Sequence, residues 1–356
     1  MPDAVLNGST ISTLGKLGVE IELMAPAGKT RQDLANLIAQ RKGGRVRRFF
    51  HPQGEPSKVP GVPVFENLTI GFVIEDDDGN TLAQCVDDLT LQEDLNQKQT
   101  PLPGWYRIVS DDARFLRLAM RHSDPTEPLE RVLDPVAALF GAVPQRGEGG
   151  MLRVADEMGA PIVLGAPLPG ERERPCELVS APIVDNHLQE IESLLEPARE
   201  LGFTIPAEGA IHIHFDAKPL CSAATFGNLV RFLGVYSDAI KAHFKTNPRC
   251  VRLGRWPIEI FDVIATPGFA QLTWEEASEK LREVKLVKFC DFNLYNLVHA
   301  PAGKHTFEVR IFPVWMEGEK IVEAARFFTQ ILDWAKDHDG TFKPVPLSFM
   351  GLRRMV

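Results

Sequence analysis

The run Gly18-Val19-Glu20-Ile21-Glu22-Leu23 alternates apolar and acidic residues in strict order. This alternation predicts a short β-strand, in which side chains two residues apart share one face. Glu20 and Glu22 then stand side by side, about 6–7 Å apart, and the apolar residues between them face a core. Because partly desolvated like charges cost on the order of several kcal/mol unless something compensates them, a hard divalent cation such as Mg²⁺ or Mn²⁺ is the expected partner. The alternative is a solvent-facing strand with two unremarkable glutamates.

The same arrangement of polar side chains over an apolar reverse face recurs later in the chain. It is found in Cys176–Ser180 with Glu177, in Ala210–Phe215 with His212 and His214, and in His305–Phe312 with Glu308 and Arg310. Strands that each carry ligand-type residues on one face are typical of an antiparallel sheet whose other face is packed. Together they predict a curved antiparallel sheet with a metal site in its concavity.

The order and spacing of these motifs resemble a known family. The motifs are GVEIEL (18–23), ELVSAP (177–182), AIHIHFDA (210–217), NLYNL (293–297) and HTFEVRIFP (305–313). The chain is similar to the amidoligases, a branch of the glutamine synthetase and glutamate-cysteine ligase superfamily of ATP-dependent carboxylate-amine ligases. The resemblance covers residues 15–30 and about 175–335. It implies an α+β fold: a glutamine-synthetase-like curved antiparallel sheet with helices packed on its outer face, plus an inserted α/β elaboration.

The resemblance also implies an activity and a set of roles. The reaction is amide-bond formation through an acyl phosphate made from ATP, with ATP and Mg²⁺ (or Mn²⁺) as cofactors. The metal ligands implied are Glu20, Glu22, Glu177, His212 and Glu308, with either histidine as a ligand or a phosphate contact. Arg310 resembles the arginine that neutralises the transferring phosphoryl group, and His214 is a candidate for the nucleotide side. Arg249, Arg252 and Arg255, spaced three apart, could line the nucleotide or substrate side, and surface placement is the alternative. Asn293 or Asn296 is expected to orient the substrate.

The segment 43–150 carries no motif of the family. We interpret it as an insertion that supplies substrate recognition, between the start of a catalytic core at 1–42 and its remainder at 151–356. Its most basic run is Arg45–His51. In this run Arg47 and Arg48 could hold a nucleotide phosphate or an anionic substrate, since guanidinium groups match such oxygens in bidentate fashion. A solvated strand edge is the alternative.

Local signals predict several helices. Thr30 is a plausible N-cap for a helix that Gly43 ends. Further helices are expected over about 186–201, 222–244, 273–285 and 319–336, the third opening with a capping box at Thr273. The acidic tip at 76–80 is expected to be a hairpin turn.

Composition bounds the class of protein. Hydrophobic residues make up 44% and charged residues 24% of the 356, as in an ordinary soluble globular protein. The net charge of −9 argues against general nucleic-acid binding and favours small-molecule or peptide substrates. No apolar stretch approaches a membrane span, and Met1–Val5 show no signal peptide. The five cysteines are widely spaced, which favours reduced thiols in the cytoplasm.

Two other functions stay open at this level. His212, His214 and one glutamate could form a two-histidine, one-carboxylate centre for Fe(II), or a zinc hydrolase site that uses no nucleotide. The chain could also be a non-catalytic descendant that binds a ligand, although each motif position still holds a competent side chain.

Overall fold

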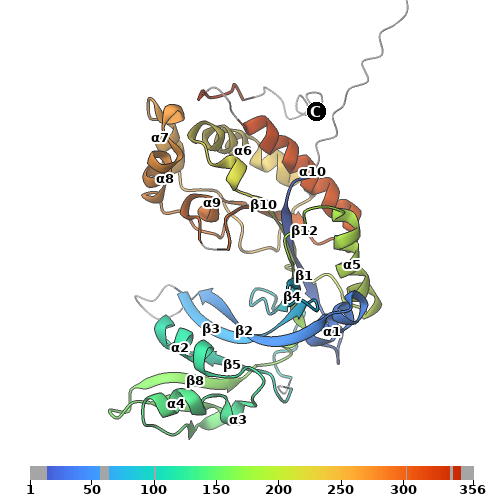
Figure 1. Ribbon diagram of the computed structural model, residues 1–356, viewed down its shortest axis with the longest axis vertical. Helices are drawn as coiled ribbons and strands as arrows, with labels where there is room; N and C mark the ends of the chain where they lie inside the picture. The colour runs from blue at the N-terminus through green and yellow to red at the C-terminus, as the bar shows by residue number, and fades with distance from the viewer. Residues whose placement is uncertain (1–13, 57–63, 100–101, 302, 337–339, 346–356) are drawn as a thin grey trace, which may run out of the picture. The chain divides into compact units, whose positions relative to one another are not determined.

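The structure is a computed structural model that describes residues 14–56, 64–99, 102–301, 303–336 and 340–345. Residues 1–5, for which no signal peptide is expected, lie outside the described residues. The chain divides into two compact units (Figure 1). Unit 1 comprises residues 1–19, 182–192 and 210–356, and unit 2 comprises 20–181 and 193–209. The segment 43–150 therefore lies wholly within unit 2.

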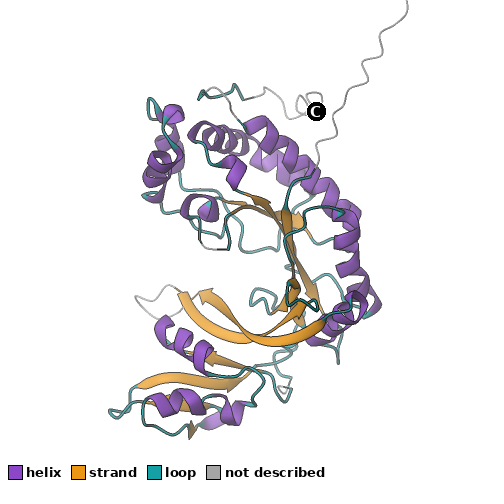
Figure 2. Ribbon diagram, in the orientation of Figure 1, coloured by secondary structure: helices purple, strands orange, loops and turns teal. Residues whose placement is uncertain are grey.

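Unit 2 is built on antiparallel strands. In the order of their pairing they are β1 (Leu17–Met24, from Glu20 on), β9 (Pro175–Ser180), β4 (Thr81–Val86), β3 (Val64–Glu75), β5 (Tyr106–Val109), β8 (Pro161–Pro167), β7 (Leu152–Ala155) and β6 (Gln145–Arg146). A further long strand, β2 (Arg45–Pro56), pairs with β3 along its whole length. Figure 2 shows β2 and β3 as a long curved ribbon pair.

The helices of unit 2 are short, and their ends follow local sequence signals. Helix α1 (Arg31–Lys42) begins at Thr30, whose side chain accepts from the Asp33 backbone N–H while the Asp33 carboxylate accepts from that of Thr30. It ends at Gly43, which adopts the left-handed conformation that glycine tolerates best. The predicted cap and stop are thus confirmed. The remaining helical elements are α2 (Ala113–His122), α3 (Leu129–Val132), α4 (Asp134–Leu139), the 3₁₀ turn η1 (Glu148–Gly150) and the end of α5 (His187–Glu200).

Unit 1 contains a smaller antiparallel group in which β12 (Thr306–Pro313) lies between β10 (Ala210–Asp216) and β11 (Phe292–Asn293). The long helices α6 (Ala223–Phe244) and α10 (Gly318–Ala335) contact each other, and α6 contacts β12. The other elements are η2 (Lys218–Leu220), α7 (Glu259–Ala265), η3 (Phe269–Gln271), α8 (Trp274–Arg282) and α9 (Tyr295–His299). Figure 1 shows α6 and α10 beside β10 and β12.

Aromatic side chains fill the interface between these helices and strands. The Phe328 ring of α10 packs on Phe312 of β12 and Phe215 of β10, with centroids 5.5 and 6.3 Å apart. Phe307, Val309 and Ile311 of β12 are fully buried. The apolar reverse face expected from the alternation is therefore present, and burial of each such side chain contributes roughly 1.5–3 kcal/mol.

The expected α+β class, with antiparallel strands and helices, is confirmed. Helices α5, α6, α8 and α10 lie within one to three residues of the predicted ranges, and the capping box at Thr273 is present. Among the described residues, no helix combines the length and the apolarity that crossing a bilayer requires.

Candidate functional site

Unit 2 gathers four carboxylates from three chain segments. Glu22 on β1 stands directly opposite Glu177 on β9 in the antiparallel register, and the charge of Glu22 acts on the Glu177 carboxyl. Ligand oxygens of Glu20 and Glu177 lie within 4.8 Å of each other. Asp88, two residues after the end of β4, is the fourth member, because its charge acts on Glu177. We call Glu20, Glu22, Asp88 and Glu177 the acidic cluster.

The electrostatics of the acidic cluster are unfavourable without a cation. Burial raises the pKa of the Glu177 carboxyl well above its usual range, and the negative charges of Glu20, Asp88 and Glu22 raise it further. Glu22 is itself only 4% exposed. Carboxylate oxygens at this density are the ligands that hard divalent cations take. The residues present therefore fit a Mg²⁺ or Mn²⁺ ion.

Asp88 is the member of the acidic cluster that sequence reasoning missed. Its carboxylate accepts from the backbone N–H and the hydroxyl of Thr90, both at 2.7 Å, which fixes the side chain in a tight turn. Val86 pairs with Glu177 across β4 and β9, so the turn after β4 leads Asp88 back beside that glutamate. A pair of acidic residues directly after a strand was the signal in the sequence.

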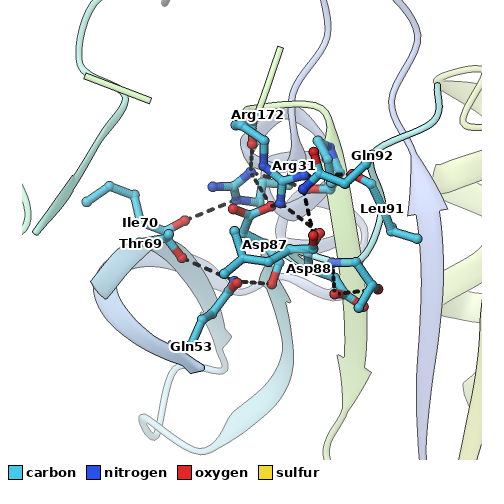
Figure 3. Close-up of polar contacts among 12 residues, drawn as sticks. Arg31, Gln53, Thr69, Ile70, Asp87, Asp88, Leu91, Gln92 and Arg172 are labelled. Carbon is cyan, nitrogen blue, oxygen red and sulfur yellow. Dashed lines mark hydrogen bonds and ion pairs between the residues drawn. The ribbon is translucent and has the colours of Figure 1, made fainter. Parts of the chain in front are cut away.

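A buried network holds this turn in place (Figure 3). Arg172 donates to the Asp87 carboxylate at 2.5 Å and to the carbonyls of Asp88 and Leu91 at 2.7 and 2.6 Å. Arg31, fully buried, donates to the Ile70 carbonyl at 3.0 Å and lies 3.9 Å from the same Asp87 oxygen. Two guanidinium groups thus share one carboxylate beneath the turn that carries Asp88.

Unit 1 places a second polar group of residues around Glu308 on β12. One Glu308 oxygen accepts from Arg310 Nη1 at 2.5 Å, and the other accepts from Asn293 Nδ2 at 2.6 Å. The side chains of Glu308 and Arg310 are 5% and 9% exposed, so this ion pair is largely withdrawn from water. Charge-assisted hydrogen bonds to both oxygens fix the carboxylate in one orientation.

The two histidines of β10 face the same carboxylate. His212 Nδ1 lies 3.6 Å and His214 Nε2 lies 3.9 Å from Glu308 Oε1. His214 stands opposite Glu308 in the register, and a bulge between Ile211 and Ile213 contains His212. The predicted common face of the two imidazoles is therefore observed. We call His212, His214, Asn293, Glu308 and Arg310 the basic cluster, since Glu308 faces three side chains that can carry positive charge.

The other predicted site residues have contacts of their own. Arg47 donates to Glu75 at 2.8 Å, and Arg48 donates to the Gly104 carbonyl at 2.9 Å. Arg255 is exposed and pairs with Asp238 at 2.6 Å. Their roles in binding, like that of the half-buried Asn296 on α9, stay predictions.

Arg252 lies in the irregular segment that joins α6 to α7, with its guanidinium 5.1 Å from the centre of the Phe289 ring. The described carboxylates form no ion pair with it, unlike Arg255 three residues later. Arg252 therefore remains available for an external anion.

Comparison with known proteins gives one positive result. The sequence model of a family described as "putative amidoligase enzyme" matches residues 15–332, which is most of the chain. Neither the curated proteins nor the solved structures give a match.

Proposed function

Because this chain belongs to the amidoligase family, we propose that it joins a carboxylate to an amine in an ATP-dependent reaction through an acyl phosphate. The substrates we propose are small: an amino acid, a peptide or a fragment derived from the cell wall. The family itself suggests an amide-bond-forming ligase; nucleotide, mechanism and substrate class are our proposal.

The chemistry requires two steps. In the first, a carboxylate oxygen attacks the γ-phosphorus of ATP, a new P–O bond forms, and the bond to the bridging oxygen breaks to release ADP. In the second, the amine nitrogen attacks the carbonyl carbon, the C–O bond to phosphate breaks, and the nitrogen loses a proton. Phosphoryl transfer asks a protein chiefly to position the reactants and to neutralise charge. The acidic cluster could contribute by binding cations, and the basic cluster could contribute by contacting the phosphoryl group directly.

The acidic cluster suits the binding of divalent cations. Glu20, Glu22, Glu177 and Asp88 would hold Mg²⁺ or Mn²⁺, whose chemistry is to bridge phosphate oxygens and neutralise their charge. The supporting observation is the raised pKa of Glu177, caused by burial and by three neighbouring carboxylates. A bound cation would relieve that repulsion.

The basic cluster suits the transferring phosphoryl group. Arg310 is held by Glu308 at 2.5 Å, which fixes the direction of the guanidinium, and His212 and His214 lie beside the same carboxylate. A guanidinium fixed in advance stabilises charge that develops on phosphoryl oxygens. We propose this role for Arg310, with His214 as a phosphate contact and Asn293 as the residue that positions Glu308. The assignment of Glu308 and His212 as metal ligands stays part of the proposal.

One observation carries the proposal: seven motif residues that can bind a cation or a phosphate fall into the two polar clusters, and none of the seven is exposed. They are Glu20, Glu22, Glu177, His212, His214, Glu308 and Arg310. We propose that both clusters serve the same reaction.

The test is phosphate release from ATP across a panel of acids and amines, with mass spectrometry of any condensed product. Glu20→Gln and Arg310→Ala should each abolish ATP turnover in the presence of Mg²⁺, while circular dichroism stays that of the parent protein. Full activity in either variant contradicts the proposed roles. Glu157→Gln, an exposed glutamate of unit 2, is the matched control.

A second candidate is a mononuclear metalloenzyme, favoured by the two imidazole nitrogens within 4 Å of one Glu308 oxygen. The same Glu308 oxygen also accepts from Arg310 at 2.5 Å. Metal analysis separates the two functions. A tightly held zinc or iron together with no ATP binding would favour this candidate over the ligase.

A further inference from the structure

We propose that Arg252, Lys288 and Phe289 of unit 1 form a clamp that binds phosphoryl oxygens. This inference rests on the proposed function and adds two residues, Lys288 and Phe289, to which nothing above gave a role. The anion it would take is a tetrahedral phosphoryl group, whether in a triphosphate chain or as free phosphate.

The geometry begins with a single aromatic ring. The Arg252 guanidinium carbon and the Lys288 ammonium nitrogen each lie 5.1 Å from the centre of the Phe289 ring. An aromatic ring attracts a cation at this distance, and the two distances place the cations no more than about 10 Å apart. Arg252 and Lys288 come from segments 36 residues apart in the chain.

These two cations have no acidic partner among the residues that the structure describes. By contrast, the nearby Arg255 pairs with Asp238 at 2.6 Å and Lys241 pairs with Asp291 at 2.8 Å. Lys288 is exposed and Arg252 is half-buried, so both cations are open to an external anion.

The local field extends to Arg310. The pKa of the Lys288 ammonium is lowered, first by partial removal of that group from water and then by the positive charges of Arg252, Arg310 and Lys304. Glu308 opposes this effect, but it is already paired with Arg310. The clamp therefore lies within electrostatic reach of the arginine proposed to meet the transferring group.

Hydrogen bonds join the chain segments that carry the clamp residues. The Asp291 carboxylate accepts from the Gly254 backbone N–H at 3.1 Å, and the Asp291 N–H donates to the Gly254 carbonyl at 2.8 Å. The Asp291 carbonyl in turn accepts from the Arg310 N–H at 3.0 Å. The segments that carry Arg252, Lys288 and Arg310 are thus joined through one residue, and Trp256 adds a bond of 2.6 Å to the Phe292 carbonyl.

The chemistry of the two side chains favours phosphate over other anions. A guanidinium offers a planar fork that matches two phosphoryl oxygens, and an ammonium offers a point charge that adapts to a third. A pair of cations on one ring, with a third cation close by, suits a ligand that carries more than one negative charge. A triphosphate chain meets this condition, and a single carboxylate does not.

The experiment measures binding by isothermal titration calorimetry, with tripolyphosphate as the first probe in the absence of divalent metal, then ATP and inorganic phosphate. Lys288→Met and Arg252→Gln should each weaken tripolyphosphate binding about tenfold or more, as expected for a lost charge-assisted contact. Lys288→Arg should keep most of the affinity. Lys285→Met and Arg282→Gln are matched controls, because both side chains are exposed and lie outside the clamp.

The outcomes are distinct. Parent-like binding of tripolyphosphate, ATP and inorganic phosphate by both Lys288→Met and Arg252→Gln overturns the clamp and leaves the ligase proposal standing. Loss of binding in these variants, with a parent protein that never turns over ATP, supports the clamp and overturns the ligase. A parent protein that binds no tripolyphosphate, and no ATP even when Mg²⁺ is added, overturns both. Weakened binding of inorganic phosphate alone would assign the clamp to the released product.

Discussion

Asn293 and Glu308 stand opposite each other on β11 and β12, and the Asn293 amide donates to the Glu308 carboxylate at 2.6 Å. The other end of the same amide, Oδ1, accepts from the Tyr295 backbone N–H at 2.9 Å, at the start of α9. Both polar ends of Asn293 are therefore engaged within the protein. Its contribution to the site is to orient Glu308.

Asn293→Ala should lower the free energy of unfolding by about 1–3 kcal/mol, because a buried carboxylate loses a hydrogen bond. Turnover should fall through kcat more than through KM, since the displaced group is Glu308 rather than substrate. Urea unfolding and steady-state kinetics measure the two effects. Asn296→Ala, on the half-buried α9, is the control for stability. Equal unfolding midpoints for the two variants would contradict the positioning role.

Asp87→Asn should be among the most destabilising single changes in unit 2. It leaves the guanidinium groups of Arg31 and Arg172 buried without their shared anion. Removing one partner of a buried ion pair typically costs about 3–5 kcal/mol. Chemical denaturation measures this loss, and Asp78→Asn, on the exposed tip of the β3–β4 hairpin, should leave the midpoint in place. A loss below about 1 kcal/mol, the range of exposed pairs, would refute the buried network.

Glu177→Gln should change the response of the protein to metal. In the parent, Mg²⁺ or Mn²⁺ should raise the melting temperature, because an ion that binds the folded state stabilises it by mass action. In a chelator, the variant should have a higher melting temperature than the parent, because it lacks the carboxyl group that Glu20, Asp88 and Glu22 repel. Its melting temperature should also rise less when Mn²⁺ is added. Differential scanning fluorimetry with added metal or EDTA gives both numbers. An unchanged Mn²⁺ shift would remove Glu177 from the ligand set.

The Cys290 thiol should resist alkylation in the folded protein. Burial raises its pKa to about 12, so at a pH of about 8, where an ordinary thiol with a pKa of about 8.5 is partly ionised, almost none of it is thiolate. The folded protein therefore binds the Cys290 thiol proton more tightly than the unfolded chain does. Cys290 therefore contributes stability that is full below the unfolded pKa and is lost as pH rises through about 12. Mass spectrometry after iodoacetamide treatment should find the half-buried Cys250 modified before Cys290.

Part of the site could be predicted because its signals are local. Alternation with a period of two places Glu20 beside Glu22 and His212 beside His214 from the sequence alone, since the strand geometry fixes which side chains share a face. The bulge at His212 did not disturb this, because both imidazoles still reach one Glu308 oxygen. Helix ends at Thr30 and Thr273 followed from capping chemistry for the same reason.

What escaped prediction depends on pairing between distant segments. Asp88 reaches the acidic cluster only because β4 pairs with β9 in one register, and a shift of one residue would send it elsewhere. Asn293 or Asn296 was expected to orient the substrate, and that role stays a prediction. The hydrogen bond from Asn293 to Glu308 was not foreseen, because it depends on a strand of two residues. Lys288 and Phe289 lie in an irregular segment with no periodicity to read.

On the proposed function, the crowding of four carboxylates in unit 2 would tie the lifetime of the protein to the supply of a divalent cation. A chain that lacks the cation is the less stable form, so a larger share of it is unfolded at any instant and open to proteases. When divalent cations are scarce, the metal-free molecules would be degraded first. The amount of the protein in the cell would then follow the amount of its metal-bound form.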